Sequence, residues 1–140
     1  MNSGSIIEAA TTLLSKTAVY EAEQHDYIIR KMFDLSSHID MEIKIELLAT
    51  QARIYCRERG MTAYEHRTDS AEDVIYCIIY EILKSAALTM TYGKFMDEKG
   101  FMLYSDEVRS YENGIMEDAF RAVGGVYELW FKAGRASMRM

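Results

Sequence analysis

One pair of side chains in this sequence has residue types and a spacing that could do catalysis. Arg59 and His66 are separated by six residues, in R-GMTAYE-H. A histidine in such a pair can act as general acid or base near neutral pH, while the arginine stabilises phosphate charge in a transition state. The pair therefore suggests RNA cleavage. The simpler interpretation is a loop arginine and a solvent-exposed histidine.

The Arg59–His66 spacing resembles that of HEPN-type ribonucleases, which are small helical domains of about this size. The resemblance implies a helical ribonuclease with Arg59 and His66 as its catalytic residues. It covers only eight residues, and Gly60 lies inside it, where a helix would be expected. We therefore keep the ribonuclease as an alternative and favour a protein that is not an enzyme.

Other common catalytic and metal sites lack their residues at usable spacing. The histidines, His25, His38 and His66, form no HExxH motif and no zinc-type cluster. Glu21 and His25 would share a helix face, but matching ligands on a second helix are missing. The sequence also has no glycine-rich phosphate loop and no GxSxG motif. We therefore expect no metal site and no cofactor.

Size and charge restrict the classes of partner. The chain of 140 residues fits one domain, 1–140, and its 22 acidic and 16 basic residues give a net charge of -6. This charge argues against direct binding to nucleic acid and favours a basic partner. The longest apolar run ends at Glu81, so no membrane-spanning segment or export signal is expected. Cys56 and Cys77 have no CxxC spacing. We predict a cytoplasmic protein that binds no membrane.

The spacing of apolar residues predicts helices along most of the chain. Proline is absent, and no glycine occurs from Ser5 to Arg59. Ser70 and Ser105 are suitable helix caps. We therefore predict an all-α bundle of about four to five helices, with one long or two short helices before residue 36. At 94–104, a small β-hairpin and a helix ending at Gly100 are both open, and the basic tail at 132–140 is expected to fray.

The stretch HIDMEIKIEL, residues 38–47, alternates polar and apolar residues, as a strand would. Its Met, Glu, Lys and Leu residues favour helix, however, and no turn residue follows before Gly60. We therefore predict a helix from Asp40 to Arg59. Such a helix has two opposite apolar stripes, so it needs neighbours on two sides: helices of its own chain, a dimer mate or a target protein. The second stripe contains Ile39, Ile43 and Leu47.

Acidic residues concentrate in the last third of the chain. Seven of them lie between Asp97 and Asp118, against Lys99 and Arg109. Acidic residues are favourable at helix starts, which would explain them without any partner. They could also form a surface complementary to a basic protein. For a partner-binding surface we predict Asp97, Glu98, Asp106, Glu107 and Glu112 together with the second-stripe residues Ile39, Ile43 and Leu47.

Together these features favour a non-enzymatic inhibitor or regulator. We expect it to block a surface of a larger complex, which could itself carry a basic nucleic-acid-binding surface. Phage and mobile-element proteins that inhibit bacterial defence systems have this size and charge. The alternatives are the ribonuclease described above and a homodimeric helical scaffold or immunity protein.

Overall fold

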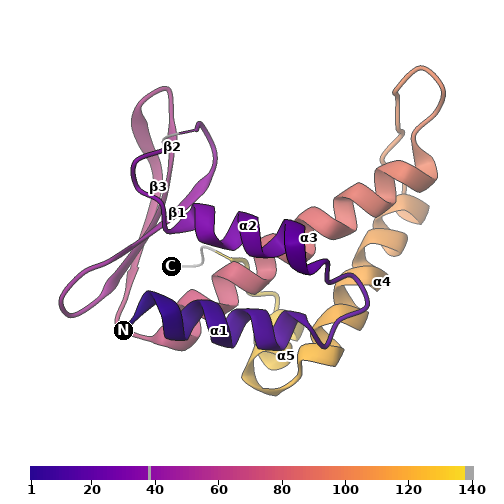
Figure 1. The fold of residues 1–140 in the computed structure, drawn as a ribbon. Coiled ribbons are helices and arrows are strands. Elements are labelled where there is room, and N and C mark those ends of the chain that lie inside the picture. The colour runs from indigo at the N-terminus through magenta and orange to yellow at the C-terminus, as the bar shows by residue number, and fades with distance from the viewer. Residues whose placement is uncertain (38, 138–140) are drawn as a thin grey trace.

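The computed structural model of this chain describes residues 1–37 and 39–137, and it contains a sheet as well as helices (Figure 1). The predicted all-α bundle is therefore wrong. His38 and residues 138–140, which belong to two of the segments discussed above, lie outside the described residues. The elements are α1 (Ser3–Leu14), α2 (Ala22–Met32), β1 (Ile43–Leu47), β2 (Ala52–Glu58), β3 (Met61–Thr68), α3 (Ala71–Phe95), α4 (Asp106–Val123) and α5 (Gly125–Lys132).

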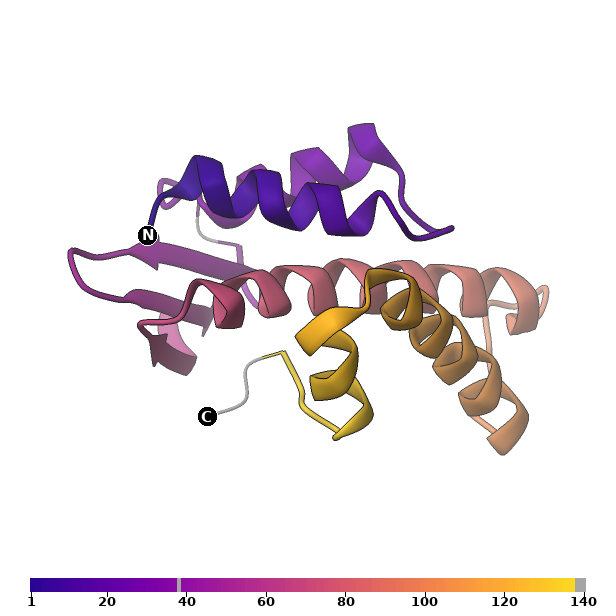
Figure 2. The ribbon, with the colours of Figure 1, turned by 90° about the horizontal axis from the view of Figure 1, so that it is seen from below.

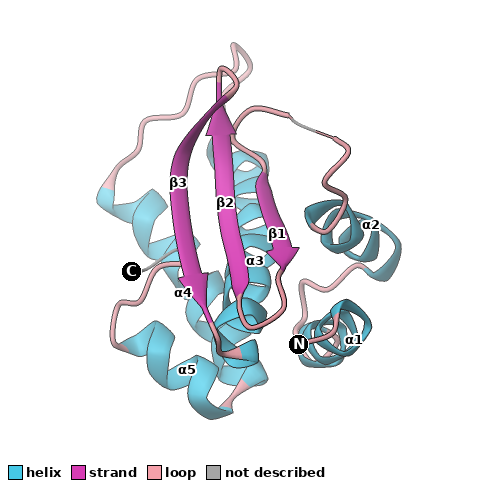
Figure 3. Ribbon diagram, turned by 90° about the vertical axis from the view of Figure 1, so that its left-hand side faces the viewer, coloured by secondary structure: helices cyan, strands magenta, loops and turns pink. Residues whose placement is uncertain are grey.

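The three strands form one antiparallel sheet in the order β1-β2-β3 (Figure 3). Ile54 on the central strand pairs with Ile45 on one side and with His66 on the other. The β2–β3 hairpin turns at Arg59 and Gly60, whose φ angles are 54° and 78°. Positive φ at both central residues is typical of a two-residue hairpin turn, and glycine supplies it without strain.

The helix predicted from Asp40 to Arg59 is also wrong, because this segment forms β1, the following turn and β2. Successive strand side chains point to opposite faces, so the alternation in the sequence places Ile43, Ile45 and Leu47 on one face. Ile45 is buried, and Ile43 and Leu47 pack against the core. Burying this face stabilises the strand by more than the weak helix propensities of the segment oppose it.

The long helix α3 lies at the centre of the molecule (Figure 2). As predicted, Ser70 caps it by accepting a hydrogen bond from the Asp73 amide. The helices α1 and α2 lie on one side of α3, α4 and α5 lie on the other, and the sheet lies over its N-terminal part. By length and composition α3 could cross a membrane, but 56% of its most apolar window is buried within the protein. Such burial is expected of a helix at the centre of a core.

The chain after α5 returns to α3. Arg135 forms an ion pair of 2.7 Å with Asp73, and its carbonyl oxygen accepts a hydrogen bond of 2.6 Å from the Tyr76 hydroxyl. The Ser137 hydroxyl donates to Glu81. These contacts hold residues 135–137, which belong to the tail expected to fray, against the first half of α3.

Several loops project from the body of the molecule, among them the turn between β1 and β2 at the lower left of Figure 1. The β2–β3 hairpin and the connection between α3 and α4 extend on the same side, at opposite ends of α3 (Figures 1 and 3). Each projection exposes residues away from the packed body of the molecule.

Candidate protein-binding surface

The connection between α3 and α4, residues 96–105, is called the α3–α4 loop below. It exposes Phe101 and Leu103, whose exposed fractions are 69% and 86%, and Met96 is also exposed. Single exposed apolar residues are normal on a protein surface, but a group of them on one projecting loop is typical of an interaction site. The loop contains no strand, so neither alternative for 94–104 is fully met: α3 runs to Phe95 and an irregular turn follows.

Asp97 organises the tip of this loop. Its carboxylate accepts hydrogen bonds of 2.9 Å from the amides of Lys99 and Phe101. The Asp97 amide donates to the Phe101 carbonyl at 2.8 Å, and Gly100 adopts a φ of 81°. Aspartate commonly closes turns in this way, and glycine permits the left-handed conformation. One oxygen of the Asp97 carboxylate is therefore committed to the shape of the loop.

A buried carboxylate holds the base of the loop. Glu112 on α4 is fully buried, accepts a hydrogen bond of 2.7 Å from Lys84 on α3, and accepts another from the Tyr104 hydroxyl. Burial raises the pKa of Glu112, but the hydrogen bonds from Lys84 and Tyr104 outweigh it and lower the pKa below its ordinary 4.5. Glu112 was predicted as a partner contact, and the structure places it inside, where it joins the loop to both helices.

Exposed carboxylates flank the apolar tip. Glu98 lies on the loop, and Asp106 and Glu107 lie in the first turn of α4, where Ser105 caps the helix as predicted. Negative charge is favourable at this helix N-terminus, so the position alone explains Asp106 and Glu107. The same position also gives the loop a negative border beside Phe101 and Leu103.

The apolar residues predicted for the partner surface lie elsewhere. Ile43 and Leu47 are half-buried on β1 and pack against the core, while Ile39, which precedes β1, is half-exposed. β1 belongs to the end of the molecule opposite the α3–α4 loop (Figure 1). The structure therefore does not bring the predicted acidic and apolar sets together. Sequence reasoning missed Phe101 and Leu103, whose only signal was their place beside Gly100 in a polar turn.

Arg59 and His66, the alternative catalytic pair, lie far apart along the β2–β3 hairpin. Arg59 lies in the β2–β3 turn, and His66 lies near the other end of β3, opposite Ile54. Seven residues of extended chain span roughly 20 Å. Nε2 of His66 is buried and has no hydrogen-bond partner among the described residues. This geometry does not place the guanidinium beside the imidazole, and the helical frame of the HEPN fold is absent from this segment.

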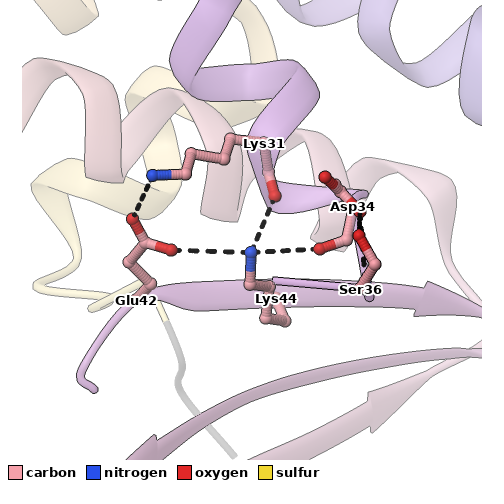
Figure 4. A network of polar contacts seen from close by, with 5 residues as sticks. All are labelled: Lys31, Asp34, Ser36, Glu42 and Lys44. Atoms are coloured by element: carbon pink, nitrogen blue, oxygen red, sulfur yellow. Dashed lines mark hydrogen bonds and ion pairs between the residues drawn. The ribbon is translucent and has the colours of Figure 1, made fainter. Parts of the chain in front are cut away.

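A second buried polar group, Lys44, was not predicted (Figure 4). This lysine on β1 is 2% exposed, and its Nζ donates to the carbonyl oxygens of Lys31 at 3.0 Å and Asp34 at 3.1 Å, at the end of α2. Glu42 lies 3.5 Å from the same nitrogen and pairs with Lys31 at 3.2 Å. A cation is favourable at a helix C-terminus, so Lys44 joins β1 to α2.

Glu21 and His25, the pair considered as metal ligands, contact each other at the start of α2. The Glu21 amide donates to Nδ1 of His25 at 3.0 Å, and His25 is buried. Burial lowers the pKa of His25, against the opposing effect of Glu21 and Asp26. Among residues 1–37 and 39–137, no three or more His, Cys, Asp or Glu side chains gather in a way that could hold a metal ion.

Comparison with known proteins adds no relative. No protein-family model, curated protein or solved structure matches this chain.

Proposed function

We propose that this protein is a non-enzymatic inhibitor or regulator that binds another protein through the α3–α4 loop. The observation that supports this most is an ordered loop that exposes Phe101 and Leu103. The Asp97 turn and the Tyr104–Glu112–Lys84 contacts hold the loop in shape, so little conformational entropy would be lost on binding. A large apolar side chain presented in this way is a common anchor of protein interfaces.

The charges around the loop indicate the chemistry of the partner. Glu98, Asp106 and Glu107 would border the contact, so the partner would offer an apolar pocket surrounded by lysine and arginine. A basic surface of a nucleic-acid-binding complex has this character, and occupation of that surface would inhibit the complex. The net charge of -6 would speed the encounter at low salt.

Site-specific crosslinking in an extract of the native host tests this function. A photo-reactive phenylalanine derivative replaces Leu103 in one sample and Met61, which is 74% exposed on the β2–β3 hairpin, in the other. We expect one discrete adduct at position 103 and none at position 61, with the partner identified by mass spectrometry. The purified partner should then lose activity when this protein is added. Equal crosslinking at both positions, or a partner whose activity is unchanged, would contradict the proposal.

The residues of the contact can then be tested on that partner. We expect the double substitution Phe101→Ala and Leu103→Ala to weaken binding by at least about 2 kcal/mol, measured by calorimetry. Replacing Glu98, Asp106 and Glu107 by lysine should slow association and reduce its dependence on salt. Because Phe101 and Leu103 are exposed, thermal unfolding of the alanine variant should stay close to that of the parent protein. The lysine variant should unfold at a lower temperature, because Asp106 and Glu107 stabilise the first turn of α4.

A further inference from the structure

A groove runs between α2 and α3, apart from the α3–α4 loop. Two adjoining hollows of about 280 and 140 Å³ share Ile28, Ile82 and Ser85, so they form one continuous depression. We call it the α2–α3 groove. In Figure 1, α2 lies between the two projections, the β2–β3 hairpin and the α3–α4 loop.

Apolar side chains line the α2–α3 groove and remain open to solvent. Tyr27, Met41 and Met90 are 65%, 55% and 43% exposed, while Ile82 is buried below them. Methionine side chains are flexible and adapt to different apolar surfaces, which is why they are frequent in grooves that bind helices. The lining therefore suits the apolar side chains of another protein segment.

The walls of the groove favour a helix over an extended strand as the bound segment. Two helices, α2 and α3, form most of the groove wall, and Met41, Glu42 and Ile43 close one end of it. Helix backbone groups are bonded internally, so a strand laid along α2 and α3 would find no backbone partners on them. On α3 the groove extends from Glu81 to Met90, ten residues or roughly 14 Å of helix. This length matches two to three turns of a helix that presents apolar residues at positions i, i+3 or i+4, and i+7.

The charged residues of the groove are mainly acidic. Glu21, Glu42 and Glu81 line it against Lys31. Lys31 and Lys44 already pair with Glu42. Among the described residues Glu21 makes no ion pair, and Glu81 accepts a hydrogen bond from the neutral Ser137 hydroxyl, which leaves its charge in place. The groove therefore keeps an excess of negative charge, which complements lysine or arginine beside the apolar face of a bound helix.

We propose that the α2–α3 groove binds an amphipathic helix of a partner protein whose apolar face is flanked by basic residues. This is a second interaction surface, and it does not depend on the function proposed for the α3–α4 loop. The binding energy comes from burial of Tyr27, Met41 and Met90 under the apolar face, and Glu21 and Glu81 orient the basic flank.

Methyl NMR with model peptides tests the groove directly. The probe is a helical Leu/Lys peptide of roughly 14 residues, and its control is a Leu/Glu peptide with the same apolar pattern. In protein labelled at the methionine methyls, we expect the basic peptide to shift the Met41 and Met90 signals in a saturable way. The acidic peptide should bind at least about tenfold more weakly, and the Met61 and Met96 signals should not move.

A large side chain placed in the α2–α3 groove should prevent the peptide from binding, and the same change elsewhere serves as its control. Ser85→Trp places a large side chain at an exposed position shared by both hollows, and Ser110→Trp does the same on α4, away from them. We expect Ser85→Trp to weaken binding of the basic peptide by about tenfold or more and Ser110→Trp to leave it unchanged. Equal binding of the acidic peptide, or no effect of Ser85→Trp, would overturn the proposal. Shifts confined to Met96 would move the contact to the α3–α4 loop and would also overturn it, without removing the loop function.

Discussion

The β2–β3 hairpin and the α3–α4 loop are both projections, but they are held in different ways. Backbone pairing between β2 and β3 holds the hairpin, and its turn needs only the positive φ angles of Arg59 and Gly60. The α3–α4 loop has no backbone ladder and depends on the side chains of Asp97, Tyr104 and Glu112. The hairpin should therefore tolerate most surface changes, whereas the loop is specified by a few particular side chains.

The two projections also differ in charge. Arg53, Arg57, Arg59 and Arg67 lie on the hairpin, and on the outer face of the sheet Arg53 stacks over Tyr55 at 3.9 Å and pairs with Glu65. The α3–α4 loop is bordered by carboxylates instead. The hairpin arginines Arg53 and Arg67 are already paired with glutamates of the sheet, whereas Glu98 and Glu107 are exposed. The loop is therefore the more acidic of the two projections, even with Lys99 at its tip.

The largest expected effect comes from removing the buried carboxylate below the loop. Glu112→Ala would leave the buried site without its charge and release both Lys84 and Tyr104. We expect a loss of about 3 kcal/mol in the free energy of unfolding, measured with urea. Glu117→Ala, an exposed acidic change in the middle of the same helix, is the control and should alter stability by less than about 0.5 kcal/mol. Equal effects of the two substitutions would show that Glu112 does not hold the loop.

The second effect is on the pH dependence of stability. The pKa of Glu112 is lower in the folded protein than its ordinary 4.5, so its contribution is present above pH 4.5 and is lost as the pH falls through the lowered pKa. Below pH 4.5 the parent protein should lose stability more steeply than Glu112→Gln, by at most about 1.4 kcal/mol per pH unit. Urea unfolding of both proteins at a series of pH values measures the difference. Parallel curves would contradict the lowered pKa.

The third effect is local to the loop tip. Asp97→Ala removes the acceptor for the Lys99 and Phe101 amides, so those amides should exchange with deuterium about tenfold faster. The unfolding free energy should change by less than about 1 kcal/mol, because the exposed tip contributes little to the core. Exchange in β2 and β3 should not change. A uniform increase along the chain would mean that the substitution acts on global stability instead.

The smallest effect is expected on the hairpin. Met61→Ser and Tyr64→Ser replace exposed apolar residues, and we expect changes within about 0.5 kcal/mol in stability and no change in affinity for the crosslinked partner. Calorimetry with that partner checks the second point. Weakened binding by these variants would place the hairpin in the interface and remove the distinction between the two projections.

Part of the fold and of the site could be read from local signals. The caps at Ser70 and Ser105 act within one helical turn, so both were found from the residue types alone. The turn from β1 to β2 was missed because it forms without glycine or proline, through a bond of 2.8 Å from the Leu48 amide to the Gln51 carbonyl. Without a turn signal, helix propensity decided the prediction for 40–59.

The sequence by itself determined where helices begin and where acidic residues gather, because caps, periodicity and charge depend on neighbouring residues. It also contained the strand alternation at Ile43, Ile45 and Leu47. Only the tertiary structure decided that these residues pair with β2, because the stabilisation comes from burial against residues distant in sequence. It likewise decided that Glu112 is buried while Phe101 and Leu103 are exposed. Whether a side chain meets solvent depends on which distant segments pack over it.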